Sequence, residues 1–165
     1  MSLPRTPSFR LDGRRALVAG ASSGIGLGAA VALADAGADV TLVARRAEPI
    51  AELARSLTDR GLAARALPLD ITDIAATETA VANHGPFDIL VNSAGLARHS
   101  PALKTTLADY DAAMDLNLRA AYFLTRAVAA GLIAAGKPGS LMNISSQTGH
   151  VGGPDRAVYC ATKHA

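Results

Sequence analysis

Tyr159 and Lys163 are the residues of this chain whose types and spacing most directly suggest chemistry. They stand four residues apart in a segment, 156–165, that has the pattern of an opening helix, so their side chains share one helical face. A nearby ammonium favours the phenolate form of tyrosine, and such a phenol can exchange a proton with an alcohol or carbonyl oxygen. Ser146 could hold the same oxygen and stabilise its developing charge. Because Tyr-x-x-x-Lys pairs also occur by chance as solvated contacts, the pair needs support from the rest of the chain.

The first element that must position this pair is a glycine-rich turn. Residues 16–19 form a short apolar run typical of a strand buried on both faces of a parallel sheet, and a helical pattern then continues to Gly37. Between them, Gly20, Gly24 and Gly26 have the spacing Gly-x-x-x-Gly-x-Gly. Glycines permit positive φ and close approach of backbone N–H groups to a ligand, and a helix N-terminus attracts a diphosphate. The turn therefore indicates a dinucleotide site, with a purely structural turn as the alternative.

Apolar strands and helical segments alternate along the rest of the chain. Further strands are expected at 39–44, 65–69, 87–91 and 140–144, and further helices at 48–60, through Ala82, at 106–135 and from 156 onward. The alternation predicts the α/β class: a Rossmann-like, doubly wound parallel sheet in three layers. One domain, 9–165, would follow a flexible leader at 1–8, pinned to the core by Phe9 and Leu11. In the first helix the expected apolar face is Ile25, Ala29, Ala32, Leu33 and Ala36.

Charged residues follow two of the expected strands at the edge where open α/β sheets bind ligands. Arg45 and Arg46 end the second strand, and no acidic residue occurs there before Glu48. This favours the extra phosphate of NADP(H) over the ribose hydroxyls of NAD(H), although the arginines could instead start a solvated helix. Asp70 ends the third strand, where it would either accept a hydrogen bond from an adenine amino group or cap the next helix.

Two asparagines also have informative positions. Asn92-Ser-Ala-Gly95 follows the fourth strand; its small residues allow close approach of a cofactor, and Asn92 can tie neighbouring strands by side-chain hydrogen bonds. Asn117 lies in the middle of the 106–135 helix. Asparagine is a poor helix former, and a buried one costs free energy if it is unpaired. Its position predicts a specific role, with a satisfied core asparagine as the alternative.

Together these motifs resemble the short-chain dehydrogenase/reductase family from roughly Phe9 to the end of the chain. Gly20-Ala-Ser-Ser-Gly24-Ile-Gly26 is similar to the family's cofactor loop, Asn92-Ser-Ala-Gly95 to its Asn-Asn-Ala-Gly signature with Ser93 substituted, and Tyr159-Cys-Ala-Thr-Lys163 to its active-site motif. The motifs occur in the family's order. The resemblance implies an oxidoreductase that prefers NADP(H), with NAD(H) as the alternative, and that interconverts a ketone or other carbonyl and a secondary alcohol, as 3-oxoacyl reductases do.

The resemblance also implies residue roles. Tyr159 would be the general acid/base, Lys163 would bind the nicotinamide ribose and favour the phenolate, and Asn117 would hold a water in a proton relay. The family's interval to the tyrosine selects Ser146 as the fourth catalytic residue and leaves Ser145 a structural role. The implied cofactor contacts are Gly20, Ser22, Ser23, Gly24, Ile25, Gly26, Arg45, Arg46, Asp70, Ile71, Asn92, Ala94, Gly95, Tyr159 and Lys163.

Composition and charge narrow the classes of partner. The chain is 50% hydrophobic and 18% charged, as in globular domains, and its net charge of +2 comes from scattered basic residues, so no nucleic acid is expected as a partner. No apolar run reaches membrane-spanning length, so no membrane is expected either. The single cysteine, Cys160, fits a reducing compartment such as the cytoplasm. No metal is expected, because the four histidines lack metal-ligand spacing: His84, His99, His150 and His164.

The remaining expectations concern assembly and length. The family usually pairs subunits through the helices containing Asn117 and Tyr159, which implies a homodimer or homotetramer. Its fold normally continues past Lys163, so the sequence favours a fragment of a longer protein, and a helix ending two residues later would fray. The alternative functions are a truncated or inactive nucleotide-binding relative acting as a binding or oligomerisation module, and an epimerase of nucleotide sugars. The spacing of the Gly20–Gly26 loop disfavours the epimerase.

Overall fold

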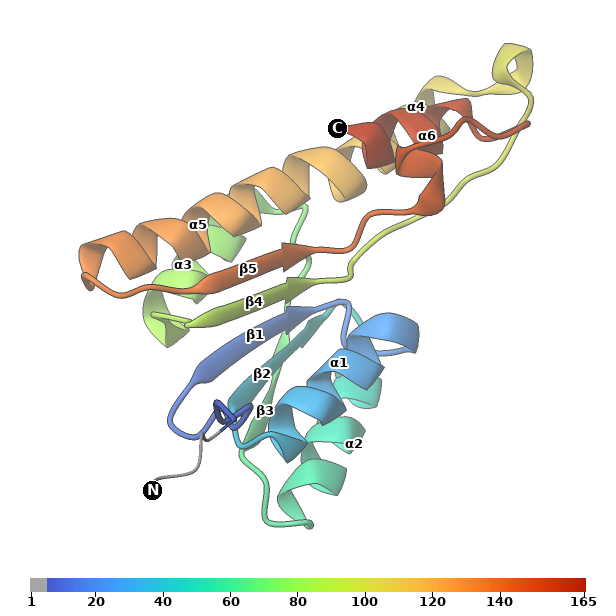
Figure 1. Ribbon diagram of the computed structural model, residues 1–165. Coiled ribbons are helices and arrows are strands. Elements are labelled where there is room, and N and C mark those ends of the chain that lie inside the picture. Colours follow the sequence, from blue (N-terminus) through green and yellow to red (C-terminus); the bar gives the residue numbers. More distant parts are fainter. Residues whose placement is uncertain (1–5) are drawn as a thin grey trace.

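Five parallel strands form a single sheet in the order β3-β2-β1-β4-β5 (Figure 1). The computed structural model describes residues 6–165, so residues 1–5 of the expected leader lie outside the described part. The strands are β1 (Arg15–Ala19), β2 (Asp39–Ala44), β3 (Ala64–Pro68), β4 (Ile89–Asn92) and β5 (Ser140–Asn143). All run in one direction, which confirms the predicted parallel sheet; the strand ends differ from the expected ones by one or two residues.

Helices cover both faces of the sheet. On one face lie α1 (Gly24–Asp35) and α2 (Ala47–Thr58), and on the other α3 (Ile74–His84) and α5 (Ala121–Ala134) (Figure 1). Two shorter helices, α4 (Leu107–Met114) and α6 (Ala157–His164), pack together near the carboxyl ends of β4 and β5. The three layers are those of the predicted Rossmann-like fold.

The central strand β1 serves both halves of the core. Ala16 and Val18 face the apolar cluster under α1 and α2, while Leu17 and Ala19 face the cluster under α3 and α5. None of the four is more than 1% exposed. Side chains alternate between the faces of a strand, so burial on both faces requires the uninterrupted apolar run seen in the sequence.

Two expectations about packing were only partly right. The buried residues of α1 are Gly26, Ala30 and Ala34; of the expected face, Ala29 and Leu33 pack against the core, whereas Ile25 is 64% exposed. This helix is so rich in alanine and glycine that its apolar periodicity defines no face, and its smallest residues let it approach the sheet. Phe9 is 85% exposed, whereas Leu11 packs against the core as expected, and its N–H donates to the Ala36 carbonyl at 2.8 Å.

The long helix expected at 106–135 is divided. Thr106 caps α4 by accepting a hydrogen bond from the Asp109 N–H, a π-helical turn follows at Asp115–Ala120, and α5 continues from Ala121. Asn117 lies within the π turn. Such turns widen a helix locally and are frequent at functional sites. Within residues 6–165, the helices fall short of the length and apolar character that crossing a membrane requires.

Candidate active site

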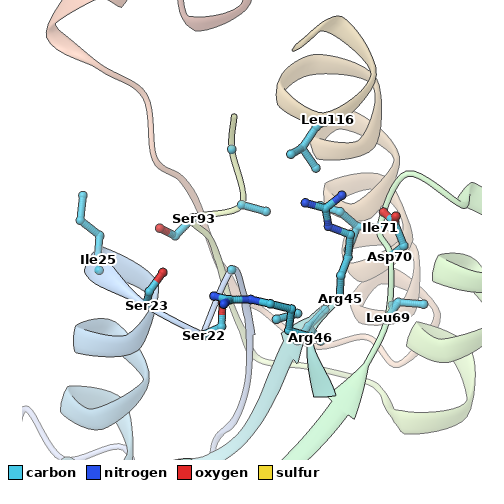
Figure 2. A pocket seen from close by; sticks show the side chains of 16 residues that line it. Ser22, Ser23, Ile25, Arg45, Arg46, Leu69, Asp70, Ile71, Ser93 and Leu116 are labelled. Atoms are coloured by element: carbon cyan, nitrogen blue, oxygen red, sulfur yellow. The ribbon is translucent and has the colours of Figure 1, made fainter. Parts of the chain in front are cut away.

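A cavity of about 630 Å³ opens at the carboxyl ends of β1 to β4 (Figure 2). Because parallel strands end at one edge, segments far apart in sequence meet here. Its lining contains most of the predicted cofactor residues: Gly20, Ser22, Ser23, Gly24, Ile25, Arg45, Arg46, Asp70, Ile71, Ala94 and Gly95. The sequence reasoning missed five more: Val43, Ala44, Leu69, Ser93 and Leu116. Only Ser93 carried a signal, as part of the Asn92–Gly95 motif.

The three glycines of the turn meet different requirements. Gly20 has a φ of +78°, and a Cβ there would lie 2.7 Å from the Ala94 nitrogen. Gly24 has a φ of +57° with open space around it, on the cavity side. Gly26 is buried beneath the turn, where a Cβ would collide with the carbonyl oxygen of Gly20. The turn therefore both packs tightly and leaves backbone open to the cavity.

The N-terminus of α1 faces this cavity without a side-chain cap. Ser23 is its N-cap residue, yet the hydroxyl makes no capping hydrogen bond. By contrast, Asp73 caps α3 through the Ala76 N–H at 3.0 Å. The first N–H groups of a helix have no intrahelical acceptor and carry a partial positive charge. These uncapped groups fit a diphosphate.

Arg45 and Arg46 extend from the end of β2 into the lining (Figure 2). Within residues 6–165 neither makes an ion pair or a side-chain hydrogen bond, whereas Arg60 and Arg65 pair with Asp35 and Asp39. Arg46 is also the N-cap residue of α2, so the helix-start interpretation is correct for its backbone. Their guanidinium groups, with fork geometry, suit a phosphate.

Asp70 lines the cavity after the end of β3, on the side of Arg45 and next to the buried Ile71 (Figure 2). Its Oδ1 accepts hydrogen bonds from the N–H of Thr72 at 3.0 Å and from the Thr72 hydroxyl at 2.8 Å. The expectation that Asp70 might cap the next helix was wrong, because Asp73 holds that position. Asp70 instead shapes the turn that presents Ile71.

Asn92 is the last residue of β4 and is 3% exposed. Its Nδ2 donates to Asn143 Oδ1 at 3.0 Å, which confirms the predicted tie between neighbouring strands, here β4 and β5. Its Oδ1 accepts from the Ala94 N–H at 3.2 Å. Asn92 therefore orients the backbone of the cavity wall without lining the cavity.

Lys163 stands between Tyr159 and this wall. Its Nζ lies 5.9 Å from the centroid of the Tyr159 ring and donates to the Ile144 carbonyl at 2.8 Å. A Cβ on Gly95 would lie 3.7 Å from the same Nζ, so the ammonium adjoins the cavity lining. Burial lowers the pKa of Lys163 from its ordinary 10.5. The pair lies on one face of α6, as the spacing predicted.

Ser145 and Ser146 make different hydrogen bonds. Ser146 Oγ accepts from the N–H of Thr148 at 3.2 Å and from its hydroxyl at 3.0 Å. Both bonds use lone pairs of Ser146, so its own proton is available to donate. Ser145 Oγ donates to the Lys163 carbonyl at 2.9 Å and so ties the β5–α6 loop to α6.

Asn117 is 7% exposed and fully engaged through its amide hydrogens. Oδ1 accepts from the Leu96 N–H at 2.8 Å, while Nδ2 donates to the Leu96 carbonyl at 2.8 Å and to Thr162 Oγ1 at 3.1 Å. The buried asparagine is thus satisfied, and its partners are the residue after Gly95 and the residue before Lys163.

Residues 14–165 match the family model described as short chain dehydrogenase. The chain belongs to the short-chain dehydrogenase family. It is 43% identical over 159 residues to D-erythrulose reductase of Gallus gallus, covering 96% of this chain and 63% of the relative. It is 41% identical over 155 residues to L-xylulose reductase of Mus musculus, covering 94% of this chain and 62% of the relative.

Solved structures agree with this assignment. The crystal structure of a gluconate 5-dehydrogenase from Burkholderia cenocepacia, in complex with NADP and tartrate, aligns with a TM-score of 0.89 at 41% identity. The alignment covers 96% of this chain and 63% of the solved one. This short-chain dehydrogenase sequence therefore spans a little over three fifths of the length of the relatives it matches.

The histidines of this short-chain dehydrogenase have separate surroundings. His99, in the loop after β4, meets Tyr159 edge to face, with ring centroids 5.8 Å apart and an interplanar angle of 76°. No sequence pattern pointed to this contact.

His150 lines a second cavity, of about 680 Å³, beside Asn117 and Lys163. Among residues 6–165, no group of three or more histidine, cysteine or acidic side chains could hold a metal ion.

Proposed function

We propose that the protein is an NADP(H)-preferring oxidoreductase that interconverts a carbonyl group and a secondary alcohol by hydride transfer. The observation that carries the proposal is the position of Lys163: its Nζ lies against Gly95, which lines the cavity, and also near the Tyr159 ring. The phenol that would exchange the proton therefore lies close to the cavity that would hold the dinucleotide, which supports the proposal.

The cavity fits the proposed cofactor. The open N–H groups at Ser23 and Gly24 would hold its diphosphate, Arg45 and Arg46 the additional phosphate of NADP(H), and Asp70 with Ile71 its adenine end. The solved relative from Burkholderia cenocepacia contains NADP, which supports this choice over NAD(H). When bound, the nicotinamide supplies or accepts the hydride.

The chain's own groups would handle the proton and the oxygen. The Lys163 ammonium has three N–H groups, one of which goes to Ile144, so two remain for the ribose hydroxyls. Tyr159 would exchange the proton with the substrate oxygen, and the free proton of Ser146 would stabilise charge on that oxygen. Both hydrogens of the Asn117 side-chain amide are already donated, so a relay water at this residue would have to donate a hydrogen bond to an oxygen atom of Asn117.

We propose small polyhydroxylated ketones as the substrate class, because the relatives are named for erythrulose and xylulose. The test uses the protein expressed from its complete coding sequence, with NADPH and D-erythrulose, L-xylulose, keto-gluconate or a 3-oxoacyl thioester. Oxidation of NADPH by a polyhydroxy ketone is the expected result. Binding of NADPH without turnover on any carbonyl would overturn the proposal and favour a nucleotide-binding module.

We also propose that the protein forms a homodimer or homotetramer in the cytoplasm and acts on small molecules rather than nucleic acid. Pairing would use the helical segments that contain Asn117 and Tyr159. Exposed apolar side chains on α4 and α5, which flank Asn117, support the first of these: Leu107 is 75% exposed and Tyr122 is 63% exposed. Light scattering after size-exclusion chromatography measures the assembly directly. A monomer at micromolar concentration would contradict this part of the proposal.

A further inference from the structure

Thr162 is a buried residue of α6 between Tyr159 and Lys163, and it is 4% exposed. Its hydroxyl donates to the Tyr159 carbonyl at 2.8 Å, a back-bond common for threonine in helices. The same oxygen accepts a hydrogen bond from Asn117 Nδ2 at 3.1 Å. A hydroxyl has one donor and two acceptor positions, so its proton is used within α6 and a lone pair links α6 to the π turn.

The direction of the hydrogen bonds permits only one orientation of the Asn117 amide. Oδ1 must face the Leu96 N–H, and Nδ2 must face the Leu96 carbonyl. With the amide reversed, Nδ2 would face the Leu96 N–H, donor against donor, and Oδ1 would face the Leu96 carbonyl, acceptor against acceptor. Thr162 Oγ1 would then meet Oδ1 of Asn117, although the Thr162 hydroxyl proton is already donated to the Tyr159 carbonyl. A continuous chain of bonds therefore runs from the Leu96 backbone through Asn117 and Thr162 to Tyr159.

This chain of bonds joins two parts of the site. Leu96 follows Gly95, which lines the cavity wall, while Thr162 precedes Lys163. The other described anchors of α6, from Lys163 Nζ to Ile144 and from Ser145 to the Lys163 carbonyl, hold it to the segment after β5. Among the hydrogen bonds of residues 6–165, the Thr162 bond is the one that links α6, through Asn117, to the loop after β4, where His99 also packs on the Tyr159 ring.

We propose that Thr162 is a positioning residue. Through Asn117, its hydroxyl fixes the position of the helix that carries Tyr159 and Lys163 relative to the Gly95–Leu96 backbone. This inference rests on the proposed function. Misplacing reacting groups by about 1 Å can cost on the order of 100-fold in rate, whereas binding of a distant cofactor end is less sensitive. Loss of the hydroxyl should therefore lower kcat more than cofactor affinity.

The experiment compares three variants of the protein expressed from its complete coding sequence. Thr162→Val keeps the shape but removes the hydroxyl, Thr162→Ser keeps the hydroxyl but removes the methyl group, and Thr79→Val is the matched control. Thr79 makes the same kind of helix back-bond, to Ala75 at 2.9 Å, but is exposed on α3. Steady-state kcat and KM are measured for an accepted carbonyl, and the Kd for NADPH by fluorescence.

We expect Thr162→Val to lower kcat roughly 10- to 100-fold while KM and the NADPH Kd change by less than about threefold. Thr162→Ser should recover kcat to within about threefold of wild type, and Thr79→Val should match wild type. A folded Thr162→Val enzyme with wild-type kcat would overturn the inference, as would Thr162→Ser as impaired as Thr162→Val, since packing of the methyl would then be responsible.

The inference can also be tested if Thr162→Val does not fold or if the wild-type protein is inactive. If Thr162→Val does not fold, Thr162→Ala replaces it, and wild-type kcat in that variant overturns the inference. If the wild-type protein turns over no carbonyl, the proposed function fails and the inference fails with it. An active wild type with an unaffected Thr162→Val removes only the role of Thr162.

Discussion

The Lys163 ammonium donates a hydrogen bond to the Ile144 carbonyl oxygen at 2.8 Å. This bond brings a charge from α6 into the half-buried gap after β5, and the loss of water around it lowers the pKa of Lys163. No acidic side chain pairs with Lys163 among residues 6–165 to offset this loss. Holding the Lys163 ammonium beside the cavity lining therefore costs the folded protein some stability.

That cost predicts a pH dependence of stability. The unfolded chain keeps the ordinary pKa of 10.5, so just below that pH it binds more protons than the folded chain, and the free energy of unfolding rises with pH. We expect wild type to gain stability relative to Lys163→Met in urea unfolding as the pH is raised towards 10.5. Other titrating groups are common to both proteins and cancel. A difference that does not change with pH would contradict the account.

Neighbouring serines give a matched pair for the chemical step. Because Ser146 keeps a proton to donate, Ser146→Ala should lower kcat by roughly 100- to 1000-fold without weakening NADPH binding. Ser145→Ala removes a bond to the Lys163 carbonyl, and a net loss of about 1 kcal/mol in unfolding free energy is expected, with kcat nearly retained. Kinetics and urea unfolding of both variants measure this contrast. Equal losses of kcat would refute the division of roles.

Two glycines of α1 should respond in opposite ways to alanine. A methyl group at Gly26 would collide with the Gly20 carbonyl, so Gly26→Ala should lose about 1–3 kcal/mol of unfolding free energy and distort the turn. Gly28 has open space around its added Cβ and is exposed, so Gly28→Ala should gain about 0.5–1 kcal/mol. Thermal or urea unfolding decides the matter. A Gly26→Ala protein as stable as wild type would show that the turn can relax.

Arg45 and Arg46, which make no ion pair within residues 6–165, predict cofactor selectivity. Replacing Arg45 and Arg46 together by alanine should raise the Kd for NADPH by roughly 100-fold or more, since each lost charge-assisted bond is worth about 1.5–3 kcal/mol, while the Kd for NADH changes little. Arg55→Ala, in the last turn of α2 and away from the cavity, is the control. Fluorescence titration with both cofactors measures the effect. Equal losses for NADH and NADPH would assign the arginines another role.

Much of the fold and part of the site could be predicted from local patterns. The apolar run at 16–19, the glycine spacing after it and the end of each strand depend on residues close in sequence, and the structure confirms the parallel sheet they indicate. The common face of Tyr159 and Lys163 follows from helical spacing alone.

Tertiary packing decided the rest. The buried face of the alanine-rich α1, the π turn around Asn117 and the contact of His99 with Tyr159 have no local signature. The partners of Asn117 lie 21 and 45 residues away, at Leu96 and Thr162. Short-range spacing determines which side chains share a helix face or follow a strand. Which hydrogen-bonding groups meet across elements is determined only when loops and helices pack together and every buried donor must find an acceptor.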